Sequence, residues 1–366
     1  MSFHKIGFIG FGLIGGSIAQ KIKQNNPSTE IIATAGHVET IEEAFQMQLI
    51  SNSTLLPLEA FADCDTIFLC APVRQNLDYL QKLKDIIQPN CCITDVGSTK
   101  SDIHQEVIRL GLESQFIGGH PMTGSEKTGI RSANASILQN AYYIITPTAA
   151  TTEEKLQEFE AFVKSLGSIP MILDYKVHDH ATASISHLPH IIAYALVHLV
   201  SEIDDASETM KRIAAGGFKD ITRIASSSPI MWQNICHSNR EQILELTDLY
   251  MEQLQQVRDY IDQNDKEALL SYFQSSKDYR DSLTVPGSKR RKSVYEIFLN
   301  LEDEAGELAI VASILAAKGI SIKNIGIIHN REFEDGVLRI EFYNNTAIDQ
   351  AEQLLSGRGY TIIKRV

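Results

Sequence analysis

Three glycines near the amino terminus have the spacing of a phosphate-binding turn. Gly10, Gly12 and Gly15 form the pattern GxGxxG between a short apolar run and an amphipathic stretch. The first glycine permits a tight turn, the second lets backbone amides approach a pyrophosphate, and the third allows close helix packing. A ligand-free glycine turn is the alternative, but the flanking strand and helix favour dinucleotide binding. The residues predicted to hold the cofactor are Gly10, Gly12, Leu13, Ile14 and Gly15.

A histidine in a glycine-rich segment is the strongest candidate for proton transfer. His120 lies in GGHPMTGSEKTG, and a neutral imidazole with an ordinary pKa of about 6.5 can accept a proton at physiological pH. The alternative is a histidine that only packs within a Gly- and Pro-containing loop. Ser98, in the segment TDVGSTK, could position His120 or a substrate hydroxyl. Capping the helix that follows is nearly as good an interpretation of Ser98.

Further polar residues occur where the sequence has helical periodicity. Arg223 has the planar fork that binds carboxylates, and its apolar neighbours predict a partly buried helix face rather than a surface pair with Asp220. His187 and His190 in SHLPH can face one side of a helix; we interpret His187 as a substrate-site residue and His190 as structural. Trp232, the only tryptophan, could lie against the substrate. We expect no metal, because no acidic or cysteine residue completes a ligand set.

The end of the second predicted strand bears on the choice of cofactor. An acidic residue about 20 residues past the third glycine commonly holds the ribose hydroxyls. Ala35 occupies that place, and the segment from Ala35 to Thr40 contains neither Arg nor Lys. We therefore predict NAD over NADP, with Glu39 or backbone groups at the ribose. His37 is the alternative partner for a 2′-phosphate.

The elements that must position these residues follow from the pattern of apolar runs. Short runs alternate with longer amphipathic stretches up to Leu173, which predicts an α/β fold with a mainly parallel sheet. From Tyr175 to about Ser282 the strand signals disappear and helical spacing takes over. Near the start of that region, His178 and His180 are interpreted as polar helix-start residues. The expected strands are 5–9, 31–34, 66–70, 91–94, 116–117, 142–146 and 169–173.

A second alternating pattern closes the chain. It predicts a βαββαβ unit with strands at 295–301, 325–329, 336–343 and 360–366 and helices at 306–318 and 347–355. A polar, turn-rich segment precedes it. The predicted domains are a Rossmann-like dinucleotide-binding domain (1–173), an all-helical substrate and dimerisation domain (174–284), a linker (285–293) and a small C-terminal domain (294–366).

Composition excludes several classes of protein. The 366 residues include 33 Lys and Arg against 46 Asp and Glu, a net charge of −13, which disfavours nucleic acid or an anionic membrane as partner. Glycines interrupt the apolar amino-terminal run, so it is too short for a membrane span or signal segment. Five cysteines without CxxC spacing indicate reduced thiols. We predict a cytoplasmic protein.

The segments GGHPM, SHLPH and KDITRIA, in this order, resemble those of prephenate dehydrogenase. The resemblance covers the chain from Lys5 to about Tyr279. It implies oxidation of prephenate to 4-hydroxyphenylpyruvate with loss of carbon dioxide, by a homodimer that pairs a nucleotide-binding domain with a helical one. It also implies that His120 acts at the substrate hydroxyl, that Arg223 binds a carboxylate, and that Glu126 gates or orients the cationic groups.

The segment LEDEAGELAIVASILAAKGISIKNIGI resembles an ACT domain, a module that commonly binds amino acids between two copies. This resemblance implies L-tyrosine as effector, because the enzyme makes its precursor. Asp303 and Gly306, in the turn before the first helix, and Asn324, opening the next strand, are the expected contacts. The alternative is a domain that only stabilises the dimer.

Three other functions stay open on the sequence. Arogenate dehydrogenase performs the same chemistry on an amine-bearing substrate. The β-hydroxyacid dehydrogenases share the two-domain plan but use a catalytic lysine in the helical part, where Lys219 is the only lysine near the candidate residues. A non-enzymatic amino-acid sensor is the third, against which His120, Ser98 and Arg223 together argue.

Overall fold

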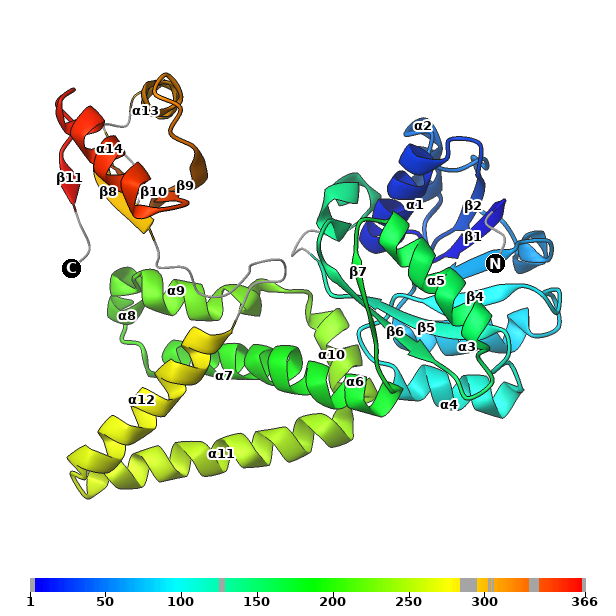
Figure 1. Cartoon of the computed structure of the whole chain (residues 1–366). Coiled ribbons are helices and arrows are strands. Elements are labelled where there is room, and N and C mark those ends of the chain that lie inside the picture. The colour runs from blue at the N-terminus through cyan, green and yellow to red at the C-terminus, as the bar shows by residue number, and fades with distance from the viewer. Residues whose placement is uncertain are drawn as a thin grey trace. The chain divides into compact units, whose positions relative to one another are not determined.

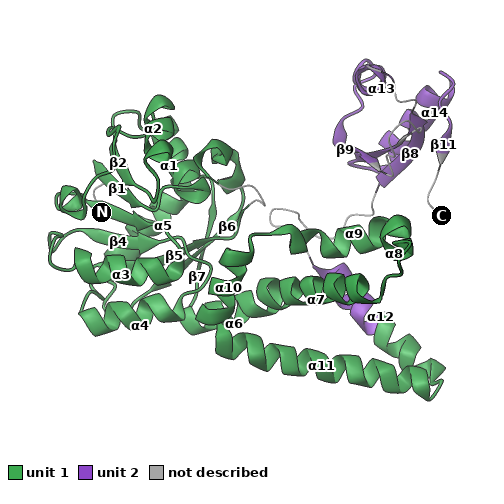
Figure 2. Cartoon of the chain, turned by 180° about the vertical axis from the view of Figure 1, so that it is seen from behind, with its two compact units in different colours: residues 1–273 green, residues 274–366 purple. Residues whose placement is uncertain are grey.

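The computed structural model describes residues 4–124, 129–283, 295–301, 304, 306–328 and 336–363. Two compact units make up the chain, residues 1–273 and 274–366 (Figure 2). The first unit contains a sheet with helices and then a run of helices, and the second contains a small sheet (Figure 1).

A seven-stranded sheet with the order β2-β1-β3-β4-β5-β6-β7 organises the first unit. Strands β1 to β5 run parallel, β6 is antiparallel to β5, and β7 is parallel to β6. The predicted α/β, Rossmann-like fold class is confirmed. The strands are β1 (Lys5–Ile9), β2 (Glu30–Thr34), β3 (Thr66–Leu69), β4 (Cys92–Asp95), β5 (Phe116–Pro121), β6 (Tyr142–Pro147) and β7 (Ile169–Ile172).

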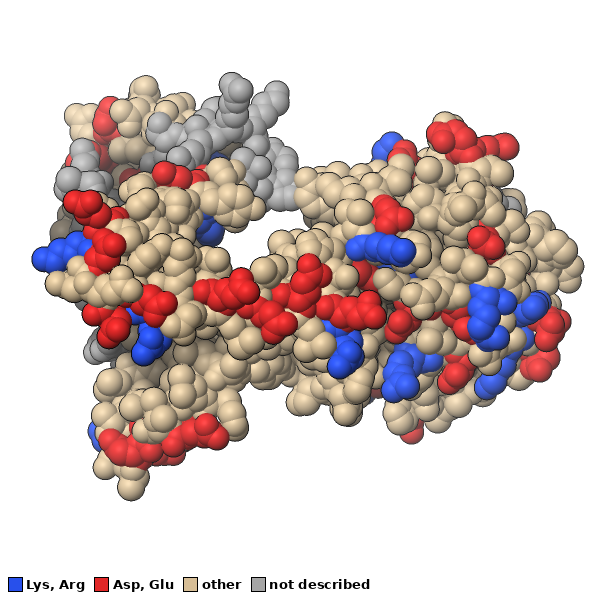
Figure 3. Space-filling model, turned by 90° about the horizontal axis from the view of Figure 1, so that it is seen from below, with Lys and Arg blue, Asp and Glu red and all other residues tan. Residues whose placement is uncertain are grey.

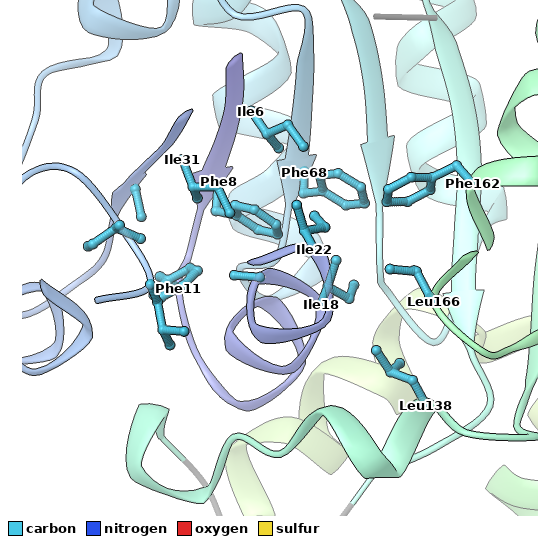
Figure 4. Close-up of a cluster of buried hydrophobic side chains, with 14 of the residues drawn as sticks. Ile6, Phe8, Phe11, Ile18, Ile22, Ile31, Phe68, Leu138, Phe162 and Leu166 are labelled. Carbon is cyan, nitrogen blue, oxygen red and sulfur yellow. The ribbon is translucent and has the colours of Figure 1, made fainter. Parts of the chain in front are cut away.

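Helices cover both faces of this sheet because successive strand residues alternate between two cores. Phe8 and Phe68 stack at 4.9 Å between ring centroids and pack with Ile18 of α1 and Phe162 of α5 (Figure 4). Leu69, the next residue after Phe68, belongs to the core on the other face. The covering helices are α1 (Leu13–Asn25), α2 (Val38–Gln46), α3 (Val73–Leu83), α4 (Ser101–Leu110) and α5 (Glu153–Ser165).

The predicted all-helical region is confirmed, and it leaves much apolar surface exposed. A small core of Ala183, Trp232, Ile235 and Ile243 holds it together. Exposed apolar residues include Leu199, Ile213 and Ile230. The helices are α6 (Tyr175–Thr182), a π-helical turn (Ala183–His187), α7 (Leu188–Ile203), α8 (Thr209–Ile213), α9 (Gly216–Thr222), α10 (Pro229–Ser238), α11 (Arg240–Asp262) and α12 (Lys266–Ser282).

The second unit has the βαββαβ order expected from the sequence. Its antiparallel sheet has the order β11-β8-β10-β9. Asn324 lies inside β9 rather than opening it, because pairing with β10 extends the strand back to Ile322. The linker predicted at 285–293 falls outside the described residues. The elements are β8 (Tyr295–Leu301), α13 (Glu307–Ala316), β9 (Ile322–Ile328), β10 (Gly336–Phe342), α14 (Asn345–Ser356) and β11 (Ile362–Ile363).

Charge on the described surface agrees with the acidic composition. On the face seen in Figure 3, Lys and Arg side chains are interspersed with Asp and Glu rather than gathered into a stripe. The thiols of all five cysteines are free, and burial raises the pKa of Cys64 to about 12.

Candidate active site

The glycine-rich turn lies where β1 meets its two neighbouring strands. Gly10 has φ +88°, and a Cβ added there would meet Ala71 N at 2.3 Å. Its amide donates to Thr34 O at 2.9 Å, which ties the turn to the end of β2. Gly15 packs against Cys70, whose Sγ would be 3.3 Å from an added Cβ. Both glycines thus have the packing reasons expected from the fingerprint.

Gly12 and the start of α1 form a cradle for an anion. A Cβ added at Gly12 would meet no atom within 4 Å, so this position opens onto free space. Helix α1 begins at Leu13, and the amides of its first turn have no intrahelical carbonyl to bind. These amides and the helix dipole fit a pyrophosphate. At the end of β2, Ala35 is half-buried and His37 is exposed.

Ser98 follows β4 and His120 lies near the end of β5, at the same edge of the sheet as the glycine turn. Strands β1 to β5 are parallel, so their carboxyl ends share one edge. From β1 to β5 there are three strand spacings, about 14 Å, so a ligand bound at the turn must extend along this edge to reach His120. Ligands of open α/β sheets bind outside the carboxyl ends of the strands.

His120 belongs to a strand, which corrects the prediction of a loop. Pairing with β6, in which His120 faces Ile144, extends β5 to Pro121. A Cβ added at Gly118 would meet Thr146 Oγ1 at 2.1 Å, and one at Gly119 would meet Asp95 O at 2.7 Å. The two glycines therefore let β5 lie close to its neighbours, although glycine itself disfavours strands.

A buried ion pair braces the loop that carries Ser98. Lys100 Nζ donates to Asp95 Oδ2, and these side chains are 0% and 1% exposed. The same carboxylate accepts the Gly97 amide at 2.9 Å and the Gly119 amide at 3.1 Å. A buried charge is tolerated when it is paired and hydrogen-bonded in this way. Asp95 thus joins the end of β4 to the strand that carries His120.

A chain of three side chains leads from His120 into the helical region. His120 Nδ1 lies 2.8 Å from His178 Nε2, and His178 Nδ1 lies 2.8 Å from Asp179 Oδ1. His178 is 0% exposed, so its interpretation as a polar helix-start residue is wrong. His180 does fit that interpretation, since it is exposed and contacts Gln242.

The surroundings of His120 keep its imidazole neutral. Burial holds the pKa of His120 well below its usual range, and the charges of His178, Lys100 and His187 act in the same direction. Burial likewise lowers the pKa of His178, although its hydrogen bond to Asp179 opposes this. A neutral imidazole can accept a proton from a hydroxyl over a wide pH range.

Asp179 also caps α4. Its Oδ1 accepts the Lys100 amide at 2.7 Å, and its Oδ2 accepts the Ser101 amide at 2.7 Å. Burial acts to raise the pKa of Asp179, but hydrogen bonds from His178 and Ser101 bring it below its ordinary value. The alternative that Ser98 caps this helix is therefore wrong, and the Ser98 hydroxyl stays available for a ligand.

His187 and His190 both lie against the indole of Trp232. His190 stacks on it with centroids 3.8 Å apart, and His187 meets it edge-on at 5.9 Å. Trp232 Nε1 is buried and has no hydrogen-bond partner among the described residues. Asn239 Nδ2 lies 3.1 Å from His187 Nδ1 and donates to Asp179 O at 2.8 Å. An unpartnered buried N–H of this kind suits a ligand acceptor.

Arg223 is exposed, which corrects the prediction of a partly buried helix face. Arg223 opens a short 3₁₀ helix (Arg223–Ser226) that follows α9 and has no buried residue. Arg223 and Asp220 form no ion pair in the described structure. The guanidinium lies near enough to His190 to lower that residue's pKa, after the larger effect of burial.

Two predictions and several unpredicted residues complete the description of the site. Glu126 falls outside the described residues. Among the residues that are described, no cluster of three or more His, Cys, Asp or Glu side chains could hold a metal. Asp95 and Lys100 lie in the segment TDVGSTK but were not predicted as site residues, and Asp179 and Asn239 lie in no motif. The roles of all four residues depend on contacts that form only when the chain folds.

A dinucleotide turn and a neutral histidine on one sheet edge define a nicotinamide-dependent dehydrogenase. Two family models match the chain, "Prephenate dehydrogenase, nucleotide-binding domain" over residues 18–170 and "Prephenate dehydrogenase, dimerization domain" over 174–275. The chain is 37% identical to the prephenate dehydrogenase of Bacillus subtilis (strain 168) over 95% of each chain. It belongs to the prephenate dehydrogenase family, as its motifs predicted.

Solved structures give the same result. The prephenate dehydrogenase of A. aeolicus in complex with hydroxyphenyl propionate and NAD+ matches with a TM-score of 0.72 and 28% identity, over 76% of this chain and 98% of that one. The arogenate dehydrogenase of Synechocystis matches with a TM-score of 0.67 and 30% identity, over 76% and 99%. Fold and family therefore agree, while the two substrates named differ.

The first prediction concerns proton transfer by His120. His120→Asn should lower kcat by at least about 100-fold, the usual cost of a lost acid–base group, with far less effect on the substrate KM. For the unaltered enzyme, kcat should hold steady as the pH falls through about 6.5, because the lowered pKa keeps the base neutral there. Steady-state kinetics across pH measure both. Near-normal kcat in the variant would show that His120 is not the base.

The second prediction concerns stability. Burial lowers the pKa of His104 and of His187 to about 4, whereas both titrate near 6.5 when unfolded. The unfolded chain therefore binds more protons in acid. The free energy of unfolding should fall by roughly 1–2 kcal/mol per histidine between about pH 7 and about pH 5. Denaturant titrations measure it, and His104→Phe should weaken the dependence. A flat profile would contradict the burial of these rings.

Proposed function

We propose that this chain oxidises prephenate to 4-hydroxyphenylpyruvate and carbon dioxide with NAD as hydride acceptor. The observation that supports this most is the position of His120 on the sheet edge that also carries the dinucleotide turn. In the reaction the ring carbon loses hydride, the hydroxyl on that carbon loses its proton, and the carboxylate bond breaks. Aromatisation of the ring drives the step.

The residues divide this work by their chemistry. His120 accepts the hydroxyl proton, and Ser98, whose hydroxyl does not cap α4, orients His120 or the hydroxyl. His187 bonds the substrate, Trp232 lies against its side chain, and Arg223 binds a carboxylate through its fork. Glu126 gates or orients the cationic groups on the strength of the family resemblance. These roles place one cation, Arg223, and a neutral base, His120, around a dianion.

NAD fits the turn at the end of β1. Residues 12–15, at the start of α1, supply amides without intrahelical partners for its pyrophosphate, and bound NAD would accept the hydride. The end of β2 offers Ala35, Gly36 and exposed His37 rather than a basic residue. A 2′-phosphate would therefore have few partners, and we expect Glu39 or backbone groups to hold the ribose.

Two alternatives remain to be separated from this proposal. Arogenate is the second candidate substrate, because a solved arogenate dehydrogenase has nearly the same fold similarity. The β-hydroxyacid type of enzyme needs a lysine in the helical part. Lys219 on α9 is exposed, and none of the described residues forms an ion pair with it. Its position therefore gives that alternative little support.

The exposed apolar face of the helical region supports a homodimer. Ile213, Ile221 and Ile230, on α8, α9 and α10, are 73%, 61% and 71% exposed, and exposed apolar surface is typical of regions that bind another protein chain. Of the described helices, the run Tyr175–Ile203 is long and apolar enough to cross a membrane by length and composition alone. Within this run, His178 and Asp179 form hydrogen bonds with residues of the sheet domain, which a membrane-spanning helix would not do. We therefore propose that a second copy of the chain covers the apolar surface of this run, and that the protein is cytoplasmic.

The second unit supports regulation by L-tyrosine. Its βαββαβ order and its sequence resemble an ACT domain, and Gly306, with φ +104°, opens α13. Asn324 is exposed on β9, where its Oδ1 accepts the Ile325 amide, so its amide nitrogen can meet a ligand. Asp303 lies outside the described residues. We propose that tyrosine binds at these three positions between paired domains and favours a low-activity arrangement.

The direct test is NADH formation with prephenate. We expect activity with NAD, and a kcat/KM for NAD above that for NADP, because the end of β2 lacks Arg and Lys. Arogenate in place of prephenate should give lower kcat/KM. Absence of NADH with prephenate would reject the proposed function, and a preference for NADP would implicate His37 or a distant basic residue.

Arg223→Ala tests carboxylate binding. Loss of a charged hydrogen bond costs about 1.5 to 3 kcal/mol, so KM for prephenate should rise roughly ten- to a hundredfold. Lys219→Ala, which removes an exposed cation from the adjacent helix α9, is the matched control and should leave KM unchanged. An unchanged KM in the Arg223 variant, with a shifted melting temperature, would indicate a structural role instead.

Truncation near residue 288 tests the regulatory domain. The shortened enzyme should keep catalysis but lose inhibition by tyrosine, because it lacks the proposed binding site. An effector shifts activity only by binding one of two arrangements more tightly than the other, and this coupling is typically about 1 to 3 kcal/mol. Initial rates with increasing tyrosine measure this. Equal inhibition of both forms would mean competition at the active site.

A further inference from the structure

We infer that Asp179 sets opposite hydrogen-bonding roles for the two histidines of the active site, through His178 and Asn239 as positioning residues. The inference rests on the proposed function for its kinetics but not for its geometry. Neither His178 nor Asn239 was singled out by the motifs, and both are buried, at 0% and 4% exposure.

The first branch fixes the tautomer of His120. Asp179 carries a charge, since its pKa is lowered, and a carboxylate can only accept hydrogen bonds. His178 must therefore donate from Nδ1 to Asp179 Oδ1. A neutral imidazole has one N–H, so His178 Nε2 is an acceptor.

His120 must then donate from Nδ1 across the 2.8 Å contact to His178 Nε2. This leaves His120 Nε2 without a proton and with its lone pair free, since no described residue bonds it. The opposite tautomer would set two lone pairs, of His178 Nδ1 and the Asp179 carboxylate, against each other. Asp179 and His178 thus make Nε2 of His120 the base.

The second branch gives His187 the reverse role. Asn239 Nδ2 contacts Asp179 O at 2.8 Å, and a backbone carbonyl only accepts, which identifies this atom as the amide nitrogen. The same nitrogen lies 3.1 Å from His187 Nδ1. His187 Nδ1 is therefore an acceptor, and its proton sits on Nε2. Burial lowers the pKa of His187 to about 4, so the ring carries one proton only.

The two branches divide the work between proton removal and binding. His120 offers an acceptor to the substrate hydroxyl, and His187 offers a donor to a carboxylate or ketone oxygen. Asp179 determines both tautomers: its carboxylate accepts from His178, and its backbone carbonyl accepts from Asn239. Loss of the first branch should therefore reduce kcat, and loss of the second should raise KM.

Substitutions on each branch separate these effects. His178→Leu should lower kcat at least about tenfold with KM within about threefold, and His178→Gln, whose Oε1 can accept from His120 Nδ1, should recover part of that loss. Asn239→Ala should raise KM for prephenate more than kcat falls. His180→Leu, on the same helix, is the control and should change neither. Equal losses in the Leu and Gln variants, or a wild-type kcat in His178→Leu, would overturn the inference.

Nitrogen NMR of the ¹⁵N-histidine-labelled full-length protein tests the tautomers without substrate. We expect His120 to be protonated on Nδ1 and His187 on Nε2, with assignments from the His120→Asn and His187→Asn spectra. The reverse tautomer at either ring would overturn the inference even if a variant failed to fold. Inactivity of the wild type with prephenate would reject the proposed function and leave this measurement to decide the tautomers.

Discussion

The buried carboxylate of Asp179 is the constraint on which the site depends. A carboxylate that is 1% exposed needs every lone pair occupied, and the amides of Lys100 and Ser101 with the imidazole of His178 meet that need. The amides belong to the start of α4 and the imidazole to α6. These bonds thus hold α6 against the carboxyl edge of the sheet, close to His120 near the end of β5.

Asp95 supplies the matching constraint inside the sheet. Its carboxylate binds Lys100, the Gly97 amide of the loop after β4 and the Gly119 amide of β5, so the ends of β4 and β5 are tied together. Removing one partner of a buried pair typically costs about 3–5 kcal/mol, because an uncompensated charge remains. The positive charge of Lys100 also disfavours a second cation at His120. One ion pair therefore serves both the geometry and the protonation state of the base.

Local patterns predicted most of the fold but only part of the site. Short apolar runs such as that from Ile6 to Ile9 indicate strands because a central strand of such a sheet is buried on both faces. The strand at Gly118 to Pro121 gave no such signal, since its glycines serve the close approach of β6. His178 gave none either, because its role exists only once α6 docks on α4. Residues in motifs, such as His120, could be found; residues that orient them depend on tertiary contacts.

The exposure of Arg223 links catalysis to assembly. A guanidinium in water contributes only about 0–1 kcal/mol to an ion pair, whereas a charged hydrogen bond shielded from water contributes more. Arg223 follows Ile221, which is 61% exposed, and precedes Ile230, which is 71% exposed. Covering this apolar surface with a second copy would remove water from around the guanidinium and strengthen its hold on a carboxylate. With the proposed homodimer and the proposed role of Arg223, substrate affinity should therefore depend on assembly even though His120, His178 and Asp179 lie within one chain.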